Sequence, residues 1–488
     1  MSVSNLKKLV ISSVLLVGDA IGQKLVGLIS TIILARILVP EDFGIIAIAL
    51  IFLGLTQVLS NTGSLQYLLK AKKINAEIVN TAWTISLYTK MLIALSFCLL
   101  AYPISIFYGD SRLTLVIIAL MVVFIIQAFR NPAEAYLKRA QTYQKIVILN
   151  LLCKVFAVAA AISVALIYES YWALVAGQFI AATIGTIGSF FIKSHRLKLT
   201  LSDVSSQWAF SKWMIPQSLF GYFRTQLDTI LVSVFYGRAE LGSFHTMKYL
   251  AYLPSANFLV PAMQPLLVEL SHFKNDKLEY SKRFNSSFFV PFLVSIPITA
   301  ILFLYGDLFT LVVLGSQWTE YSSILSFFAL LIPANIIFQT CARTLIIYGH
   351  SKHLLIAEVI MFMLIYVTLL GTNIESIKQF TIVRALMENV LCMSLMILIS
   401  VLFTSKLSTV RLIITITLLI IATLPTFYLV EFIPMQDSPL VSLIIKSFSF
   451  SIVYFAIILL IYFALKRYMA DWYYTAQLLK KIMPLKKI

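Results

Sequence analysis

The sequence predicts an all-α protein that crosses a membrane many times, and three observations support this prediction. The 488-residue chain is 60% hydrophobic and only 12% charged, whereas soluble domains are nearer half apolar and a quarter charged. Its mean hydropathy is +0.93. The apolar residues form continuous runs of about 20, the length of a membrane-spanning helix, rather than the shorter alternating stretches of a membrane β-barrel.

These apolar runs number about fourteen, and short loops separate them. The second and the eighth run are longer than a bilayer requires, so we expect those helices to tilt. The expected spans are 10–37, 43–69, 80–102, 113–131, 146–167, 171–192, 213–236, 241–269, 285–305, 321–347, 354–371, 379–404, 411–431 and 440–465.

Basic residues in the loops predict the orientation of the spans. Most of the 38 lysines and arginines fall in one alternating set of loops and tails, which includes 70–73, 138–145 and 466–487. The opposite set of loops holds Arg36, Arg112, Arg238 and Lys378. Cytoplasmic loops carry the excess of positive charge in membrane proteins. We therefore expect both termini in the cytoplasm, which requires an even number of spans.

The longest loop divides the chain into two halves, and its Ser202, Asp203 and Trp208 suit a short interfacial helix. The C-terminal tail interleaves aromatic residues with lysines, which suits an amphipathic helix on the anionic cytoplasmic leaflet, with binding of a partner as the alternative. The expected domains are an N-terminal six-helix lobe at 1–200, a cytoplasmic interfacial linker at 201–212, a C-terminal six-helix lobe at 213–405, two additional transmembrane helices at 406–466 and a basic amphipathic tail at 467–488.

A weak internal repeat supports the division into halves. Residues 34–50 (LARILVPEDFGIIAIAL) align with residues 233–249 (SVFYGRAELGSFHTMKY), which places Gly44 on Gly242 and Glu41 near Glu240. Both segments join the first and second spans of a half. Repeated halves that meet around a central site are typical of transporters.

Several basic residues lie inside the apolar runs rather than in the loops. A charge at bilayer depth costs several kcal/mol unless it faces water or a partner. Arg343, Arg384 and Lys446 lie near span ends, where a long side chain can reach the headgroups. The deeper ones are Lys24, Lys90, Lys154, Arg224 and Lys248. We therefore predict a water-filled, cationic cavity whose substrate is an anion held by these five residues.

Two acids, Asp19 and Asp228, lie at a similar depth. Arg224 and Asp228 are four residues apart, the spacing of an intrahelical ion pair, and Arg384 and Glu388 share this spacing. Arg224 therefore fits either a structural ion pair or a substrate contact. The five deep bases exceed the two deep acids, so the predicted cavity keeps an excess of positive charge.

Catalytic and metal-binding patterns are absent from the sequence. It contains no Walker loop for ATP hydrolysis, and its four cysteines lie in apolar runs without CxxC spacing. His350 and His353 lack the neighbouring carboxylates or cysteines of a metal site. No run combines basic and aromatic residues in a nucleic-acid-binding pattern. We therefore expect no enzyme activity, no metal site and no nucleic acid partner.

The segment 34–63, LARILVPEDFGIIAIALIFLGLTQVLSNTG, resembles the first loop and second span of Wzx-type polysaccharide flippases. These proteins belong to the multidrug/oligosaccharidyl-lipid/polysaccharide (MOP) superfamily. Further similarity runs from the RNP sequence at 130–132 to YWALVAGQ at 171–178. The specific motifs lie in the first two hundred residues, and the second half resembles the family mainly in its layout.

The resemblance implies a V-shaped, MATE-like bundle of two six-helix lobes with two peripheral helices. It also implies passage of an undecaprenyl-pyrophosphate-linked oligosaccharide across the bacterial cytoplasmic (inner) membrane by alternating access, for O-antigen lipopolysaccharide or another surface polysaccharide. Coupling to a proton or sodium gradient is implied as well, with Asp19 and Asp228 as the candidate acids. Whether the transporter works beside a polysaccharide polymerase and a chain-length regulator is left open.

Three other functions remain as alternatives. A peptidoglycan lipid precursor flippase handles the same diphosphate chemistry, so a cationic interior fits it equally well. A drug/cation antiporter of the same superfamily needs a negative interior, which the deep charges disfavour. A polysaccharide polymerase usually needs a long extracytoplasmic loop, and the loops on that side are short.

Overall fold

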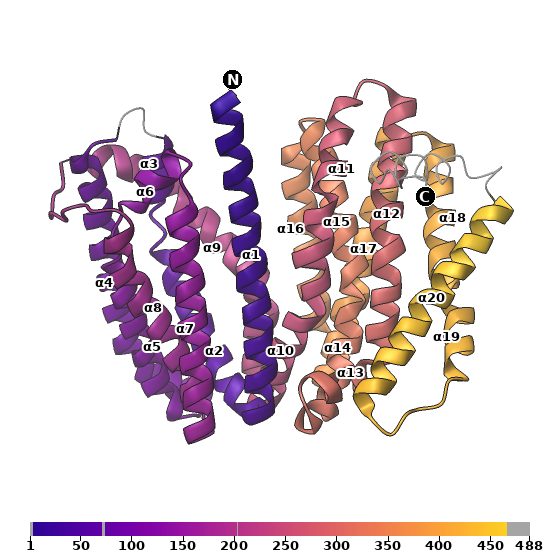
Figure 1. Ribbon diagram of the computed structural model, residues 1–488, viewed down its shortest axis with the longest axis horizontal. Helices are drawn as coiled ribbons and strands as arrows, with labels where there is room; N and C mark the ends of the chain where they lie inside the picture. The colour runs from indigo at the N-terminus through magenta and orange to yellow at the C-terminus, as the bar shows by residue number, and fades with distance from the viewer. Residues whose placement is uncertain (1–2, 71–73, 203, 466–488) are drawn as a thin grey trace. The chain divides into compact units, whose positions relative to one another are not determined.

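The computed structural model describes residues 3–70, 74–202 and 204–465, and all regular secondary structure within these ranges is helical (Figure 1). Eleven stretches of the described chain are long and apolar enough to cross a membrane, and α5 (Arg112–Ala128) is a shorter apolar helix. The predicted all-α, multi-pass fold is therefore confirmed. The number of fourteen spans stays a prediction, and the expected amphipathic tail at 467–488 lies outside the described residues.

Two compact units make up the chain, Met1–His245 and Thr246–Ile488. The division falls inside α10 (Arg238–Pro254) and not in the expected linker at 201–212. Residues from Val204 onward already belong to α9 (Val204–Phe235), one continuous helix in place of an interfacial segment followed by a span. Because α9 packs against α2, it belongs to the first unit.

The first unit is a helix bundle in which α7 packs against both α8 and α1. In the same bundle, α5 packs against α8, α4 and α2. The helix ends carry ordinary signals: the Ile78 N–H donates to Asn75 Oδ1 (2.8 Å) at the start of α4, and Gly109, with φ at 64°, ends it. The long helices besides α5 and α9 are α1 (Val3–Ile37), α2 (Pro40–Leu59), α4 (Ala76–Tyr108), α7 (Gln144–Tyr168) and α8 (Trp172–Ile192).

Three connecting segments lie at one end of the first unit, which we call its basic end, and hydrogen bonds join two of them to each other and the third to α4. It consists of α3 (Ser64–Lys70), α6 (Glu134–Arg139) and residues 193–202. Arg139 Nη1 donates to the Leu68 carbonyl (3.1 Å), and the Thr81 and Thr200 hydroxyls are 3.0 Å apart. Residues 193–202 and α6 belong to the predicted set of basic loops, whereas α3 lies in the last part of the expected span 43–69 and reaches that set only at Lys70.

Ion pairs join the connections at the opposite end of this unit. Arg112 Nη2 lies 2.6 Å from Glu41 Oε1 and 2.9 Å from Asp110 Oδ2. Arg238 Nε lies 3.7 Å from the same Asp110 oxygen, and the Tyr171 N–H donates to Asp42 (3.2 Å). The two predicted sets of loops therefore lie at opposite ends of the first unit.

The internal repeat has the same local structure in both copies. At the start of α2, the Val39 N–H donates to Asp42 Oδ2 (3.3 Å). At the start of α10, the Gly237 N–H donates to Glu240 Oε2 (2.6 Å). The acidic residue three positions on thus caps the helix in each copy. Glu240 corresponds to Asp42 and not to Glu41, which instead binds Arg112.

The two aligned glycines lie where α2 and α10 cross. A Cβ atom on Gly44 would overlap the carbonyl oxygen of Arg238, and a Cβ atom on Gly242 would overlap the carbonyl oxygen of Pro40. Pro40 and Arg238 occupy equivalent positions, four residues before each glycine. The contact is therefore reciprocal, and only glycine lets the two backbones approach this closely.

An aromatic stripe on α12 (Lys277–Leu304) forms the centre of the second unit. Tyr280, Phe284, Phe288 and Phe292 recur every four residues, so they share one helix face, and each is almost fully buried. Phe450 and Tyr454 of α20 (Pro439–Leu465) enter the same core. The two helices expected to stand outside a six-helix lobe therefore pack into the second unit.

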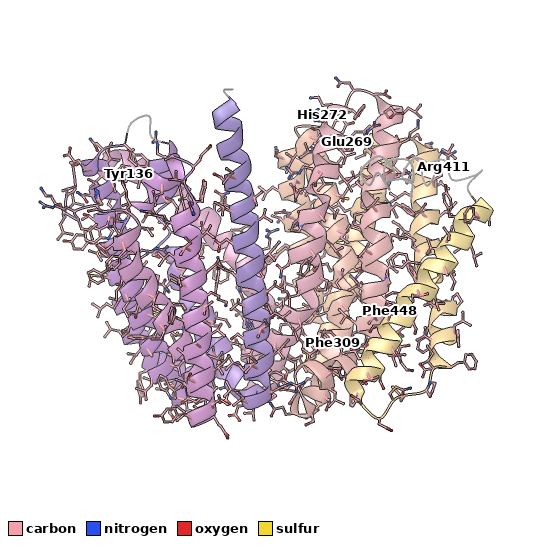
Figure 2. The ribbon with its side chains drawn as sticks, viewed as in Figure 1. Tyr136, Glu269, His272, Phe309, Arg411 and Phe448 are labelled. Carbon is pink, nitrogen blue, oxygen red and sulfur yellow. The ribbon has the colours of Figure 1, made fainter. Side chains whose placement is uncertain are left out.

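Other helices surround α12 in the second unit. Figure 2 shows Glu269, His272 and Arg411 at one end of this unit and Phe309 at the other. His272 and Arg411 flank loops of the predicted basic set, so the loops alternate here as well. The surrounding helices are α11 (Val260–His272), α13 (Gly306–Val313), α14 (Ser322–Ala329), α15 (Leu331–Ile347), α16 (Ser351–Gly371), α17 (Ile377–Phe403), α18 (Lys406–Ile421) and α19 (Thr423–Glu431).

We predict that alanine at either crossing glycine destabilises the protein. Gly44→Ala and Gly242→Ala each push the backbones of α2 and α10 apart, which lowers the free energy of unfolding by at least about 2 kcal/mol. Thermal unfolding in detergent measures this loss. Gly18→Ala is the matched control, because nothing lies within 4 Å of the added atom, and helix propensity favours that change. Equal melting temperatures for Gly44→Ala and wild type would contradict the reciprocal contact.

We also predict that mild acid loosens the basic end. His195 Nε2 lies 2.9 Å from Asn80 Oδ1 and packs near Tyr136, and burial lowers the His195 pKa below the ordinary 6.5. The unfolded chain therefore takes up the proton first, so this stability is present above pH 6.5 and is lost as pH falls through the lower folded pKa. Melting temperatures between pH 7.5 and 5 should fall less in His195→Gln, while the exposed His272→Gln keeps the wild-type slope.

Candidate functional site

A cavity of about 540 Å³ lies inside the first unit, bounded by α1, α4, α5, α7 and α8. Its lining on α7 runs from Asn150 to Ala161, and on α8 from Leu174 to Thr186. At 1.5 Å per residue the cavity follows these helices for about 17 Å, roughly half the thickness of a hydrocarbon core. Its volume is in the usual range of small-molecule binding sites.

Three basic side chains line this cavity, and no acidic side chain does. They are Lys90 of α4, Arg130 directly after α5, and Lys154 of α7. Arg130 Nη2 lies 3.2 Å from Glu134, which also binds Lys138 (2.6 Å).

The two lysines are not neutralised within the described part of the chain. Neither forms an ion pair there, and the Lys90 ammonium lies 5.9 Å from the centre of the Phe124 ring. Arg130 is close enough to Lys90 for their charges to repel. Two uncompensated ammonium groups beside a third cation make a site that favours an anion.

Neutral hydrogen-bonding groups complete the wall. Gln127 of α5 and Gln178 of α8 line the cavity, and no protein partner for either carboxamide occurs among the described residues. Thr186 also lines the cavity but donates its hydroxyl proton to the Ile126 carbonyl (2.9 Å). The two glutamines can therefore donate to and accept from a ligand.

Asp19 lies directly behind this wall, on α1. The side chains of Gln23 and Asn150, which both line the cavity, donate to its carboxylate at 2.7 and 3.1 Å. Asp19 is only 7% exposed, so these two amides satisfy a buried acceptor. The bond from Asn150 also links α7 to α1.

The predicted site residues separate into two groups. Lys90 and Lys154 lie on this cavity, and Asp19 lies behind its wall. The others are elsewhere: Lys24 is half-buried on α1, Arg224 is exposed on α9, Asp228 is 3% exposed, and Lys248 is half-buried in the second unit. Their predicted roles in binding and coupling stay predictions.

Arg130 was missed because it was counted with the basic residues of the following loop, although it falls at the end of the expected span 113–131. Its signal in the sequence is the spacing from Gln127, one helical turn earlier at the same end of α5.

Two bases within the predicted spans of the second unit are compensated by carboxylates. Arg384 binds Glu388, as the four-residue spacing predicted. Lys446 is 2% exposed and lies 3.2 Å from Glu431. Each of the two bases therefore contacts a carboxylate of its own unit, and the Glu431 side chain is itself 58% exposed. Contact of Arg384 and Lys446 with the headgroups stays a prediction.

The family described as "Polysaccharide biosynthesis protein" matches residues 33–323. The succinoglycan biosynthesis transport protein ExoT of Rhizobium meliloti (strain 1021) is 22% identical over 300 residues, 61% of each chain. The lipopolysaccharide biosynthesis protein WzxC of Escherichia coli (strain K12) is 20% identical over 66% of this chain and 65% of its own. The alignments thus span about two thirds or less of these relatives.

Solved structures share the fold of this chain. The lipid II flippase MurJ, in an inward closed conformation, has a TM-score of 0.70 at 16% identity and covers 93% of this chain and 99% of its own. An inward-facing multidrug resistance MATE transporter of the MOP superfamily has a TM-score of 0.57 at 11% identity, over 78% and 94%. These likenesses show the fold, which is that of multi-pass helical transporters.

We predict that Asn150→Leu destabilises the first unit. The change removes a donor from a buried carboxylate, at a cost of about 1–3 kcal/mol. Gln178→Leu is the matched control, since it removes a cavity amide that has no described protein partner. In detergent, Asn150→Leu should unfold at a lower temperature than Gln178→Leu. The double variant Asp19→Leu with Asn150→Leu should lose less stability than Asn150→Leu alone, because no buried carboxylate is left without its donor. Identical melting temperatures for both single variants would exclude a structural role for this bond.

Proposed function

This chain belongs to the polysaccharide biosynthesis protein family, and on that premise we propose that it is a flippase for lipid-linked oligosaccharides. The observation that carries the proposal is the pair of uncompensated lysines, Lys90 and Lys154, in one cavity with Arg130. The lipid-linked oligosaccharide is an undecaprenyl-pyrophosphate derivative, and its diphosphate is the anion that these side chains bind.

Charged and neutral side chains of the cavity bind different parts of the proposed ligand. Lysine ammonium groups make short, charge-assisted contacts to phosphate oxygens. Gln127 and Gln178 present planar amides, which donate to and accept from sugar hydroxyls. A cavity that offers both kinds of group suits a ligand that joins a diphosphate to a saccharide.

The substrate enters from the basic end of the first unit in this proposal. Loops of that end carry most of the charge predicted to be cytoplasmic, so the diphosphate meets Arg130 first and the deeper Lys90 and Lys154 next. The protein lies in the bacterial inner membrane with both termini in the cytoplasm. Alternating access then opens the cavity to the other side.

Asp19 is the better placed of the two candidate coupling acids. Its carboxylate accepts hydrogen bonds from two residues that line the cavity, so a proton or a sodium ion at Asp19 changes the contact between α1 and α7. Asp228 is also buried, at 3% exposed, and is the second candidate. Binding of the coupling ion at Asp19 therefore acts directly on two residues that line the proposed substrate cavity.

A peptidoglycan precursor flippase is the second candidate, because the fold likeness to the lipid II flippase covers most of the chain. That substrate carries the same diphosphate, so the lysines do not separate the two functions. A drug/cation antiporter is disfavoured by the absence of acidic side chains from the wall of this cavity. Rescue of cells depleted of their lipid II flippase distinguishes the first two, and we expect none.

We predict that Lys90→Ala and Lys154→Ala each lower flipping at least tenfold. A charge-assisted hydrogen bond contributes about 1.5–3 kcal/mol, which corresponds to this change. Surface polysaccharide in a deletion strain and lipid-linked oligosaccharide retained on the inner leaflet measure the effect.

Lys198→Ala is the matched control, because this exposed lysine of the basic end does not line the cavity. Lys90→Arg and Lys154→Arg should keep part of the activity, since they keep the charge. Normal polysaccharide at normal protein level in both alanine variants would falsify the proposed diphosphate site.

A further inference from the structure

A second hollow, distinct from the cavity, lies on another face of the α7–α8 pair. This groove has a volume of about 470 Å³, and among the nine side chains that line it only Lys145 is charged. Leu149 and Ile192 form its buried floor, and Leu152 and Phe191 are exposed along its rim. The rest of its lining is aliphatic or glycine.

The groove and the cavity have no lining residue in common. The helix pair between them is closely packed: a Cβ atom on Gly177 would lie 3.1 Å from the Ala157 carbonyl oxygen, and one on Gly185 would lie 3.5 Å from Cys153 Sγ. No polyprenyl chain passes between backbones this close. A ligand of the groove is therefore separate from the cargo of the cavity.

The groove begins at the basic end of the first unit. On α7 it runs from Lys145 to Leu152, or about 10 Å at 1.5 Å per residue. Lys145 and Lys193, which directly follows the groove residue Ile192, are both exposed at this end. No ion pair of either lysine occurs among the described residues.

We propose that this groove binds an anionic phospholipid of the surrounding leaflet. One acyl chain lies along Leu149 and Leu152, and the phosphate lies at Lys145 and Lys193. The two lysines supply charge complementarity that a zwitterionic headgroup satisfies less well. The groove runs for about 10 Å, roughly a third of the hydrocarbon thickness that a partner transmembrane helix would cross, and this length matches the upper part of an acyl chain.

Native mass spectrometry of the full chain tests the proposal with two added lipids, phosphatidylglycerol and phosphatidylcholine. We expect a tightly retained phosphatidylglycerol, and about a fivefold loss of its affinity in Lys145→Ala, the effect of one lysine at a membrane surface. Leu152→Trp fills the groove and should lower the binding of the same lipid. The matched controls are Lys198→Ala at the same end and Val155→Trp on the exposed face of α7, outside the groove.

The possible results separate the sources of the ligand. Equal retention of the two phospholipids, or equal losses in Lys145→Ala and Lys198→Ala, overturns the proposal. Displacement of phosphatidylglycerol by undecaprenyl phosphate also overturns it, because the groove then holds the carrier lipid. Flipping activity is not the readout of this experiment. A negative result for the groove therefore does not argue against the proposed diphosphate site, and a negative result for that site does not argue against lipid binding in the groove.

Discussion

Burial of charge in an apolar bundle is the constraint on which the rest of this structure depends. An ionised group at bilayer depth needs water, an opposite charge or a ligand. In the second unit, Lys446 forms an ion pair with Glu431 and Arg384 forms one with Glu388. In the first unit, Lys90 and Lys154 line an elongated cavity in which no acid takes part. The same physical need thus yields structural pairs in one unit and the proposed binding site in the other.

The sequence predicts those features that follow from the position of a residue inside or outside an apolar run. Lys90 and Lys154 were recognised because each interrupts such a run, and the two sets of loops because charge alternates along the chain. Arg130 was missed because it lies at the very end of its expected span, where it was counted with the basic loop and not with the deep bases. The Lys446–Glu431 pair joins two helices across a turn, and no helical spacing predicts a contact of that kind.

The repeat shows how far a short alignment can be taken. Laying Gly44 on Gly242 predicted that the two positions are equivalent, but it contained no information that they touch. In the structure each glycine lies against the backbone of the other copy, and Asp42 and Glu240 cap their helices in the same way. Equivalent residues that contact each other reciprocally lie close to a local two-fold axis. The repeat is therefore an element of packing as well as of sequence.

The α7–α8 pair has opposite properties on its two faces, and this difference constrains the path of the cargo. One face presents Lys154, Asn150 and Gln178 to the cavity, whereas the other presents aliphatic side chains to the groove. Glycines keep the two helices too close for a lipid tail to pass between them. A substrate whose diphosphate occupies the cavity must therefore extend its polyprenyl chain past other helices. In the proposed function, the helix pair that binds the diphosphate is therefore not the place where the polyprenyl chain leaves the cavity.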